Sequence, residues 1–186
     1  MEPQEKLERF ERSVIPYMDA AYNLARWLAR NDQDAQDIVQ EAYLRAFRFF
    51  DGFRGGDNRA WLLRIVRNTF YTFLQRNRKE EAIATLDEEL PVAESDSKRP
   101  DTLLLREADS ELLRDAIEAL SPEFREILVM RELEGLSYKE ISSVAEVPLG
   151  TVMSRLARAR QQLREMLAEG FGERGAAKRT ARIRGV

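Results

Sequence analysis

The residues with the most evident chemistry lie in the stretch YKEISSVAEVPLGTVMSRLARAR, residues 138–160. Its apolar residues recur at helical spacing on both sides of a turn that contains Pro148 and Gly150, which predicts a helix-turn-helix. Polar residues that share one face of the second helix can hydrogen-bond to base edges in the major groove or neutralise phosphates. These residues are Thr151, Ser154, Arg155 and Arg158. The pattern predicts binding to duplex DNA, although a helical hairpin with solvated arginines has the same spacing.

A second group of candidates surrounds the glycine-containing loop DGFRGGDN, residues 51–58. Basic and aromatic residues are interleaved through the loop and the following segment, residues 59–79, a combination that holds unstacked single strands. An aromatic stripe at helical spacing is more often a core, so we assign Trp61, Leu62 and Ile65 to packing. The remaining candidates for strand binding are Phe53, Arg54, Asp57, Asn58 and Asn68.

Asp37 and Glu41 lie four residues apart and share one helix face, as a pair of catalytic carboxylates could. No neighbouring residue suggests a substrate pocket or a second catalytic role. The sequence has no histidine and no cysteine, which excludes imidazole-based triads, cysteine nucleophiles, disulfides and metal sites built from imidazole or thiolate. There is no glycine-rich phosphate loop either. We therefore expect no catalysis, no metal and no cofactor.

Charge is distributed unevenly along the 186 residues, whose net charge is −3. Between residues 80 and 118 thirteen acidic residues face only four basic ones, whereas the stretches on either side are rich in arginine. Salt screens fields beyond about 10 Å, so association with a polyanion depends on local rather than net charge. Two basic patches separated by an acidic stretch are compatible with two DNA contacts, and equally with two solvated helix faces.

Helical periodicity runs through most of the sequence, and no segment shows the sustained alternation of a β-strand. We predict an all-α fold with two small domains, residues 1–78 and 107–168. An acidic linker, residues 79–106, would join them because it combines high charge with two prolines and few large apolar residues. Residues 169–186 are glycine-rich, basic and unpatterned, which predicts a mobile tail.

Neither a secretory signal nor a membrane span is evident. The first residues, MEPQEKLERFERSV, are charged and lack an apolar core. No apolar run approaches the roughly 20 residues that cross a bilayer. We therefore expect a soluble, cytoplasmic protein without membrane insertion.

Three segments together resemble the small two-domain bacterial sigma factors of the extracytoplasmic-function (ECF) group. They are DAQDIVQEAYLRAF, FRGGDNRAWLLRIVRN and LSPEFREILVMRELEGLSYKEISSVAEVPLGTVMSRLARARQQL. Each segment alone is moderately specific, and their order around a variable acidic linker is highly specific. The resemblance implies a subunit that makes RNA polymerase promoter-specific in a stress or envelope response, with an anti-sigma factor as a further partner.

The resemblance also implies roles for single residues. The helix that includes Asp37, Gln40, Glu41 and Arg45 would dock on the clamp of the polymerase β′ subunit, and the C-terminal domain would meet the β flap. The loop from Phe53 to Asn58 would capture a base flipped from the −10 element, while Asn68 would help to hold the melted strand. The helix-turn-helix would read the −35 element through Ser154, Arg155 and Arg158, and the acidic linker would follow the RNA-exit region.

Two positions depart from the family pattern. Thr72 stands where many members carry an aspartate, which changes the expected −10 contacts. Met153 stands where some relatives have a basic residue, which can shift the −35 preference. The alternative is a stand-alone helix-turn-helix regulator whose N-terminal half senses a signal or dimerises. That protein would bind duplex DNA tightly and specifically without polymerase.

Overall fold

The computed structural model describes residues 3–53, 55–84 and 104–184, and within these ranges the chain forms helices and no β-strand. The elements are α1 (Pro3–Val14), η1 (Ile15–Tyr17), α2 (Met18–Ala29), α3 (Asp32–Phe49), η2 (Phe50–Gly52), α4 (Asn58–Ala84), α5 (Leu104–Ala119), α6 (Pro122–Leu128), η3 (Val129–Leu133), α7 (Tyr138–Ala145) and α8 (Leu149–Arg184). The all-α prediction is confirmed. No helix in the described ranges is long and apolar enough to cross a membrane.

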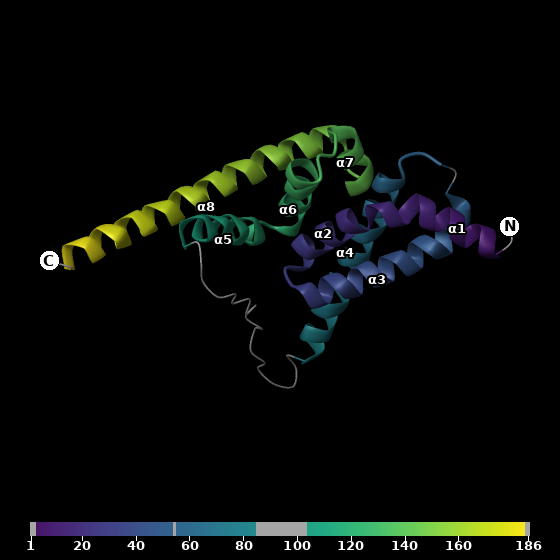
Figure 1. Ribbon diagram of the computed structural model, residues 1–186, viewed down its shortest axis with the longest axis horizontal. Helices are drawn as coiled ribbons and strands as arrows, with labels where there is room; N and C mark the ends of the chain where they lie inside the picture. Colours follow the sequence, from purple (N-terminus) through teal and green to yellow (C-terminus); the bar gives the residue numbers. More distant parts are fainter. Residues whose placement is uncertain (1–2, 54, 85–103, 185–186) are drawn as a thin grey trace.

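The N-terminal domain is a bundle in which α2, α3 and α4 pack on one another (Figure 1). Its core consists of fully buried side chains that recur at helical spacing, as the periodicity predicted. The largest of them are Leu24, Leu28, Ile38, Phe50, Leu62 and Leu63. The helix boundaries also follow local chemistry, since Asn31 caps α3 by accepting a hydrogen bond of 2.8 Å from the backbone N–H of Asp34.

In the C-terminal domain, α5, α6 and α7 pack against α8. Pro122 occupies the first turn of α6, where its missing N–H is tolerated. The apolar seam predicted for the helix-turn-helix is present, because Ile141 and Val144 on α7 are fully buried together with Val152 and Leu156 on α8. Residues Val129–Leu133 form a π-helical turn that carries the chain from α6 toward α7.

The helices extend past the domain limits expected from the sequence. Helix α4 continues to Ala84 and α5 begins at Leu104, so both enter the segment expected to be linker. Residues 85–103 of that segment lie outside the described residues. The segment expected to be a mobile tail continues α8 as far as Arg184, and this part of the helix projects away from the rest of the molecule (Figure 1).

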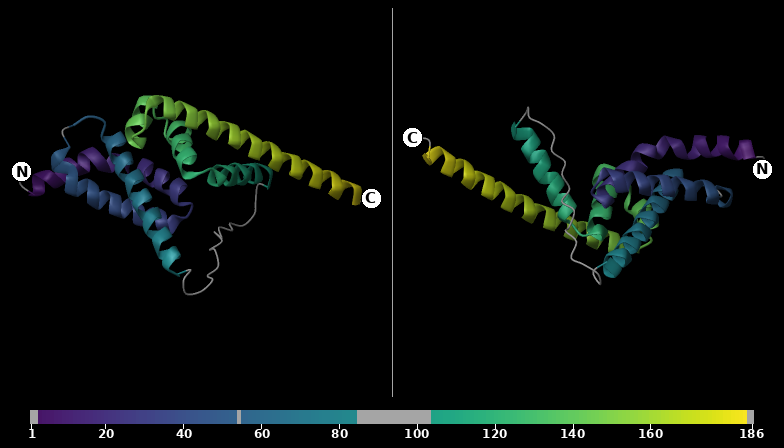
Figure 2. Two further views of the ribbon diagram at one scale, coloured as in Figure 1. Left: turned by 180° about the vertical axis from the view of Figure 1, so that it is seen from behind. Right: turned by 90° about the horizontal axis from the view of Figure 1, so that it is seen from below.

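The two domains lie directly against each other. Helix α2 contacts α6, and α4 contacts α7, so the first helix of the helix-turn-helix packs on the long helix of the N-terminal domain (Figure 2). No sequence pattern predicted this arrangement, and it determines the surroundings of the candidate site.

Candidate nucleic-acid interface

Local hydrogen bonds determine the geometry of the helix-turn-helix. Ser137 and Glu140 form a capping box at the start of α7, in which the Ser137 N–H donates to the Glu140 carboxylate (2.6 Å) and the Glu140 N–H donates to the Ser137 hydroxyl (3.3 Å). These bonds hold the pKa of Glu140 below its usual range. Helix α7 ends at Glu146, which has left-handed backbone angles (φ 55°, ψ 41°). The turn between the two helices therefore has a defined shape.

The four residues predicted to meet duplex DNA lie on one face of α8. Burial of Val152, Leu156 and Ala159 leaves the opposite side of the helix toward solvent. Ser154 and Arg158 are exposed, and Thr151 and Arg155 are half-buried. The spacing of three, four and seven residues along this face matches that of a helix lying in a groove.

Arg155 is not free in this structure, because it faces a buried carboxylate. Its Nη1 lies 3.9 Å from Oε1 of Glu126, whose side chain is fully buried. The same carboxylate accepts hydrogen bonds from Nε (2.8 Å) and Nη2 (3.1 Å) of Arg67 on α4. Burial raises the pKa of Glu126, and the Arg67 guanidinium opposes that shift by stabilising the ionised form. Glu126 therefore joins both domains through one charged cluster.

Asn68, the predicted −10 residue on α4, is also engaged across the domain boundary. Its amide donates to Oε2 of Glu146 (3.4 Å), and Nη1 of Arg64 lies 4.0 Å from the same carboxylate. Thr72, at the position that departs from the family pattern, donates its hydroxyl to the backbone oxygen of Asn68 (2.9 Å). Thr72 therefore bonds to its own helix rather than presenting a carboxylate.

Two residues of the predicted base-capturing loop already have partners within the N-terminal domain. The Phe53 ring lies 4.7 Å from that of Trp61, and the Asp57 carboxylate accepts a bond of 3.0 Å from the Ala60 N–H at the start of α4. Asn58 is half-buried at the first position of that helix. The remaining predicted loop residue, Arg54, lies outside the described residues.

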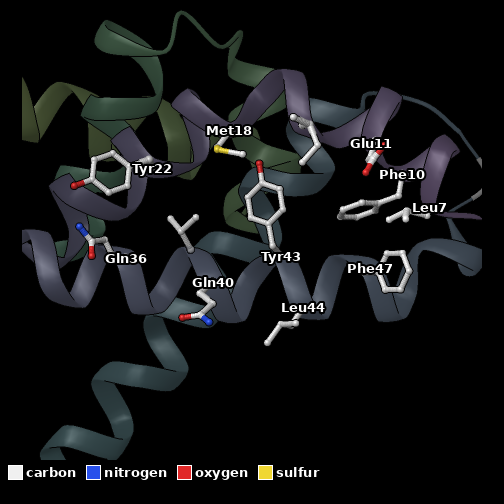
Figure 3. A pocket seen from close by; sticks show the side chains of 12 residues that line it. Leu7, Phe10, Glu11, Met18, Tyr22, Gln36, Gln40, Tyr43, Leu44 and Phe47 are labelled. Carbon is white, nitrogen blue, oxygen red and sulfur yellow. The ribbon is translucent and has the colours of Figure 1, made fainter.

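The third predicted surface lies on α3, on a different side of the N-terminal domain. Asp37 and Gln40 are exposed, and Arg45 donates to the Glu41 carboxylate (2.7 Å) as an i,i+4 pair. Gln40 borders an open apolar groove of about 570 Å³ that lies between α3 and the segment formed by α1, η1 and α2 (Figure 3). Its lining residues are Leu7, Phe10, Glu11, Ile15, Met18, Tyr22, Gln36, Val39, Gln40, Tyr43, Leu44 and Phe47. The predicted polar residues therefore stand beside an apolar surface that the sequence did not reveal.

The residues that connect the domains were missed by the sequence reasoning. Arg125 on α6 is only 3% exposed and donates to the backbone oxygens of Trp27 and Leu28 on α2, each at 3.1 Å. Arg59 on α4 donates to the Glu134 carboxylate at 2.5 Å, and Asn23 donates to the same group. A charged residue on a predicted helix is normally solvated, so its type and spacing gave no sign of these partners.

The described residues contain no cluster of three or more acidic side chains, or other ligands, that could hold a metal ion. The candidate residues lie on three surfaces. One is the outer face of α8, a second comprises the loop before α4 and the Asn68 side of that helix, and the third is the α3 face with its groove.

The family of this chain follows from comparison of its sequence with known proteins. Residues 14–80 match the family model described as Sigma-70 region 2, and residues 110–163 match Sigma-70, region 4. The chain is 36% identical over 173 residues to the ECF RNA polymerase sigma factor SigE of Mycolicibacterium smegmatis, covering 91% of this chain and 66% of that protein. It is 33% identical to the RNA polymerase sigma-H factor of Pseudomonas aeruginosa, covering 85% of this chain and 86% of that protein. The chain belongs to the ECF group of RNA polymerase sigma factors.

A solved structure shares the fold. The sigma factor RpoE of Bartonella quintana, crystallised in complex with the anti-sigma factor NepR, superposes with a TM-score of 0.69 and 26% sequence identity. The match covers 87% of this chain and 98% of that chain, so it includes both domains.

Proposed function

We propose that this chain binds core RNA polymerase and directs it to promoters by reading the −35 element with α8 and holding the melted −10 element with the N-terminal domain. The observation that carries this proposal is the face of α8 that presents Thr151, Ser154 and Arg158 to solvent from a well-packed helix-turn-helix. Arginine on such a face pairs with guanine or with phosphate, and serine and threonine bond to either.

The surface on α3 supports a role in binding polymerase. Monomeric proteins rarely expose large contiguous apolar patches without a function. Leu44 is 61% exposed and Met18 45% exposed beside the groove, and the polar residues Gln40 and Asp37 lie along the same helix. An apolar centre with a polar rim is the usual composition of a protein–protein interface. We assign the clamp of the β′ subunit to this surface.

The acidic net charge fits a subunit that acts within a larger assembly. Polymerase would supply much of the binding energy, so tight DNA binding by the isolated chain is not required. We further propose that the chain has no catalytic activity of its own and acts in the cytoplasm. An anti-sigma factor is proposed as a second protein partner, since a similar sigma factor was crystallised with one.

Run-off transcription on a genomic fragment library, with purified core polymerase, tests the proposal. We expect discrete start sites that require the chain and are preceded by a shared pair of motifs. Arg158→Ala should lower initiation about ten-fold, because one base or phosphate contact contributes about 1–3 kcal/mol. Arg164→Ala is the matched control, since Arg164 is also exposed on α8 but lies outside the predicted face.

Two outcomes would contradict the proposal. Initiation that is unchanged by Arg158→Ala would remove the assigned −35 surface. An absence of new start sites, together with specific duplex binding by the isolated chain, would instead favour the stand-alone regulator.

A further inference from the structure

The exposed surface at the start of α8 is divided lengthwise into two strips. The four residues predicted to meet duplex DNA form the polar strip. Leu149, Met153 and Ala157 recur every four residues, so they lie in one row along the helix and form the apolar strip. Leu149 is 39% exposed and Met153 48% exposed, and Ala157 is exposed as well. The apolar strip therefore adds little to the core of the domain.

The two strips are neighbours on the side of α8 that faces away from the core. An α-helix has 3.6 residues per turn, so residues three or four apart lie next to each other on its surface. Ser154 of the polar strip lies three residues before Ala157 and directly follows Met153. A ligand that lies along the polar strip consequently also lies beside the apolar one.

The charge around both strips fits a polyanion. No acidic residue occurs in α8 from Leu149 to Arg164, whereas this stretch contains four arginines. The first turn of the helix has no acidic residue either, although the helix dipole favours one there. The apolar strip ends near Arg160, whose guanidinium donates to the Glu132 carboxylate within the same domain. DNA can therefore approach the strip without meeting an unpaired carboxylate on this helix.

Duplex DNA offers one apolar group of matching size at its base edges. In the major groove, the C5-methyl group of thymine is the apolar feature that a side chain can recognise. The row from Leu149 to Ala157 is about 12 Å long at about 1.5 Å per residue. This length corresponds to three or four base pairs at about 3.4 Å per pair. Met153 lies at the centre of the row, and a methionine side chain is flexible enough to fit an irregular apolar surface.

A protein partner fits the apolar strip less well than DNA does. A stable protein interface usually buries about 800 Å² on each partner and involves about 20–30 residues a side. The apolar strip is one side chain wide and borders the arginine-containing polar strip rather than a larger apolar area. A narrow apolar row beside polar, cationic groups is instead the composition that base edges and phosphates require.

We propose that Met153, together with Leu149 and Ala157, reads thymine methyl groups in the −35 element. This inference rests on the proposed function and adds the sequence preference of the same helix. The polar strip contacts phosphates and hydrogen-bonding groups, and the apolar strip distinguishes thymine from cytosine, which has no methyl group. A basic residue at position 153, as some relatives have, would favour guanine there instead.

Removal of single methyl groups from the DNA tests the proposal. Duplexes enriched from a random library by the chain in complex with core polymerase supply the −35 sequence. Each thymine in that sequence is then replaced singly by deoxyuridine, which keeps the hydrogen-bonding groups and lacks the methyl group. We expect binding to weaken about four-fold at each contacted position, because burial of one methyl group shifts an equilibrium by about that factor. Deoxyuridine outside the −35 element is the control and should leave the affinity unchanged.

A variant of the chain identifies the side chain that contacts the methyl group. Met153→Ala should bind the thymine and deoxyuridine duplexes equally at one position, so the four-fold discrimination is lost there. Such coupling between a side chain and a methyl group reports direct contact, which a structural role of Met153 would not produce. Gln162→Ala is the matched control, since Gln162 is exposed farther along α8 and should keep the discrimination.

Two results would overturn the proposal. One is an unchanged affinity after deoxyuridine replaces every thymine of the −35 element. The other is a methyl effect that persists in both Met153→Ala and Leu149→Ala, since the methyl group would then act through the shape of the DNA.

Failure of the proposed function gives a different result. Enrichment can be repeated with the isolated chain, and its duplexes can be tested with the same replacements. If polymerase starts no transcription with the chain while Met153 still couples to a methyl group, the proposed function fails and the thymine contact remains. If neither selection enriches a sequence, both proposals fail.

Discussion

Replacing Arg125 with methionine should destabilise the whole chain, because this guanidinium connects three helices. It donates to Trp27 and Leu28 at the end of α2 (3.1 Å each), and to Glu118 (2.9 Å) and Leu120 (2.7 Å) at the end of α5, always to backbone oxygens. The last carbonyls of a helix have no partner within it, so Arg125 satisfies groups that would otherwise be buried unpaired.

The magnitude follows from two opposing contributions. Four hydrogen bonds from a charged donor contribute about 6–8 kcal/mol at about 1.5–2 kcal/mol each. Against this, burial is the main reason that the pKa of Arg125 is lowered to about 10, with Arg30 adding to the effect. That shift corresponds to a cost of about 3 kcal/mol for holding the charge in the interior. We therefore expect Arg125→Met to lower the free energy of unfolding by about 3–5 kcal/mol.

Urea unfolding followed by circular dichroism measures this loss. Arg131→Met is the matched control, because Arg131 makes one such bond, to the backbone oxygen of Leu136 (2.8 Å), inside its own domain. The control should cost about 1 kcal/mol. Arg125→Lys should lie between the wild type and Arg125→Met, since an ammonium group cannot reach all four carbonyls with a planar fork. The reasoning fails if Arg125→Met costs no more than Arg131→Met.

Two further predictions concern the helix-turn-helix and the groove. Ser137→Ala should lower the free energy of unfolding by about 1 kcal/mol through loss of the cap. The pKa of Glu140 is lower in the folded protein than in the unfolded chain, so the resulting stabilisation is complete above the unfolded pKa and is lost as the pH falls through the folded pKa. Ser137→Ala should therefore weaken the dependence of the free energy of unfolding on pH in this range, as measured by denaturation at several pH values. An equal dependence in both proteins would argue against the cap. Leu44→Glu should weaken binding to core polymerase in fluorescence anisotropy without changing helix content, because Leu44 is 61% exposed beside the groove; undiminished affinity would exclude this surface.

Much of the fold could be read from the sequence because it depends on local rules. The 3.6-residue apolar period placed the cores of both domains, and local signals at Asn31 and Pro122 account for the starts of α3 and α6. The helix-turn-helix was predictable for the same reason, since its apolar seam and its turn lie within 23 residues. Family membership followed from three segments in a specific order, and the comparisons with known proteins confirm it.

The contacts between domains could not be read in this way. Arg67 and Glu126 are 59 residues apart, and Asn23 and Glu134 are 111 apart. Each looks by itself like an ordinary charged or polar residue on a helix surface. The roles assigned to the DNA-contacting and polymerase-contacting residues stay predictions.

Glu146 shows how a local backbone feature can be tied to the state of the whole molecule. A left-handed residue that ends a helix is usually glycine, because a side chain there costs about 1 kcal/mol or more. Glu146 bears that strain at φ 55°, and its carboxylate contacts Asn68 on the other domain. A glycine at this position would relax the turn and release Asn68 at once. One substitution at this position would therefore stabilise the turn and, at the same time, remove a contact between the two domains.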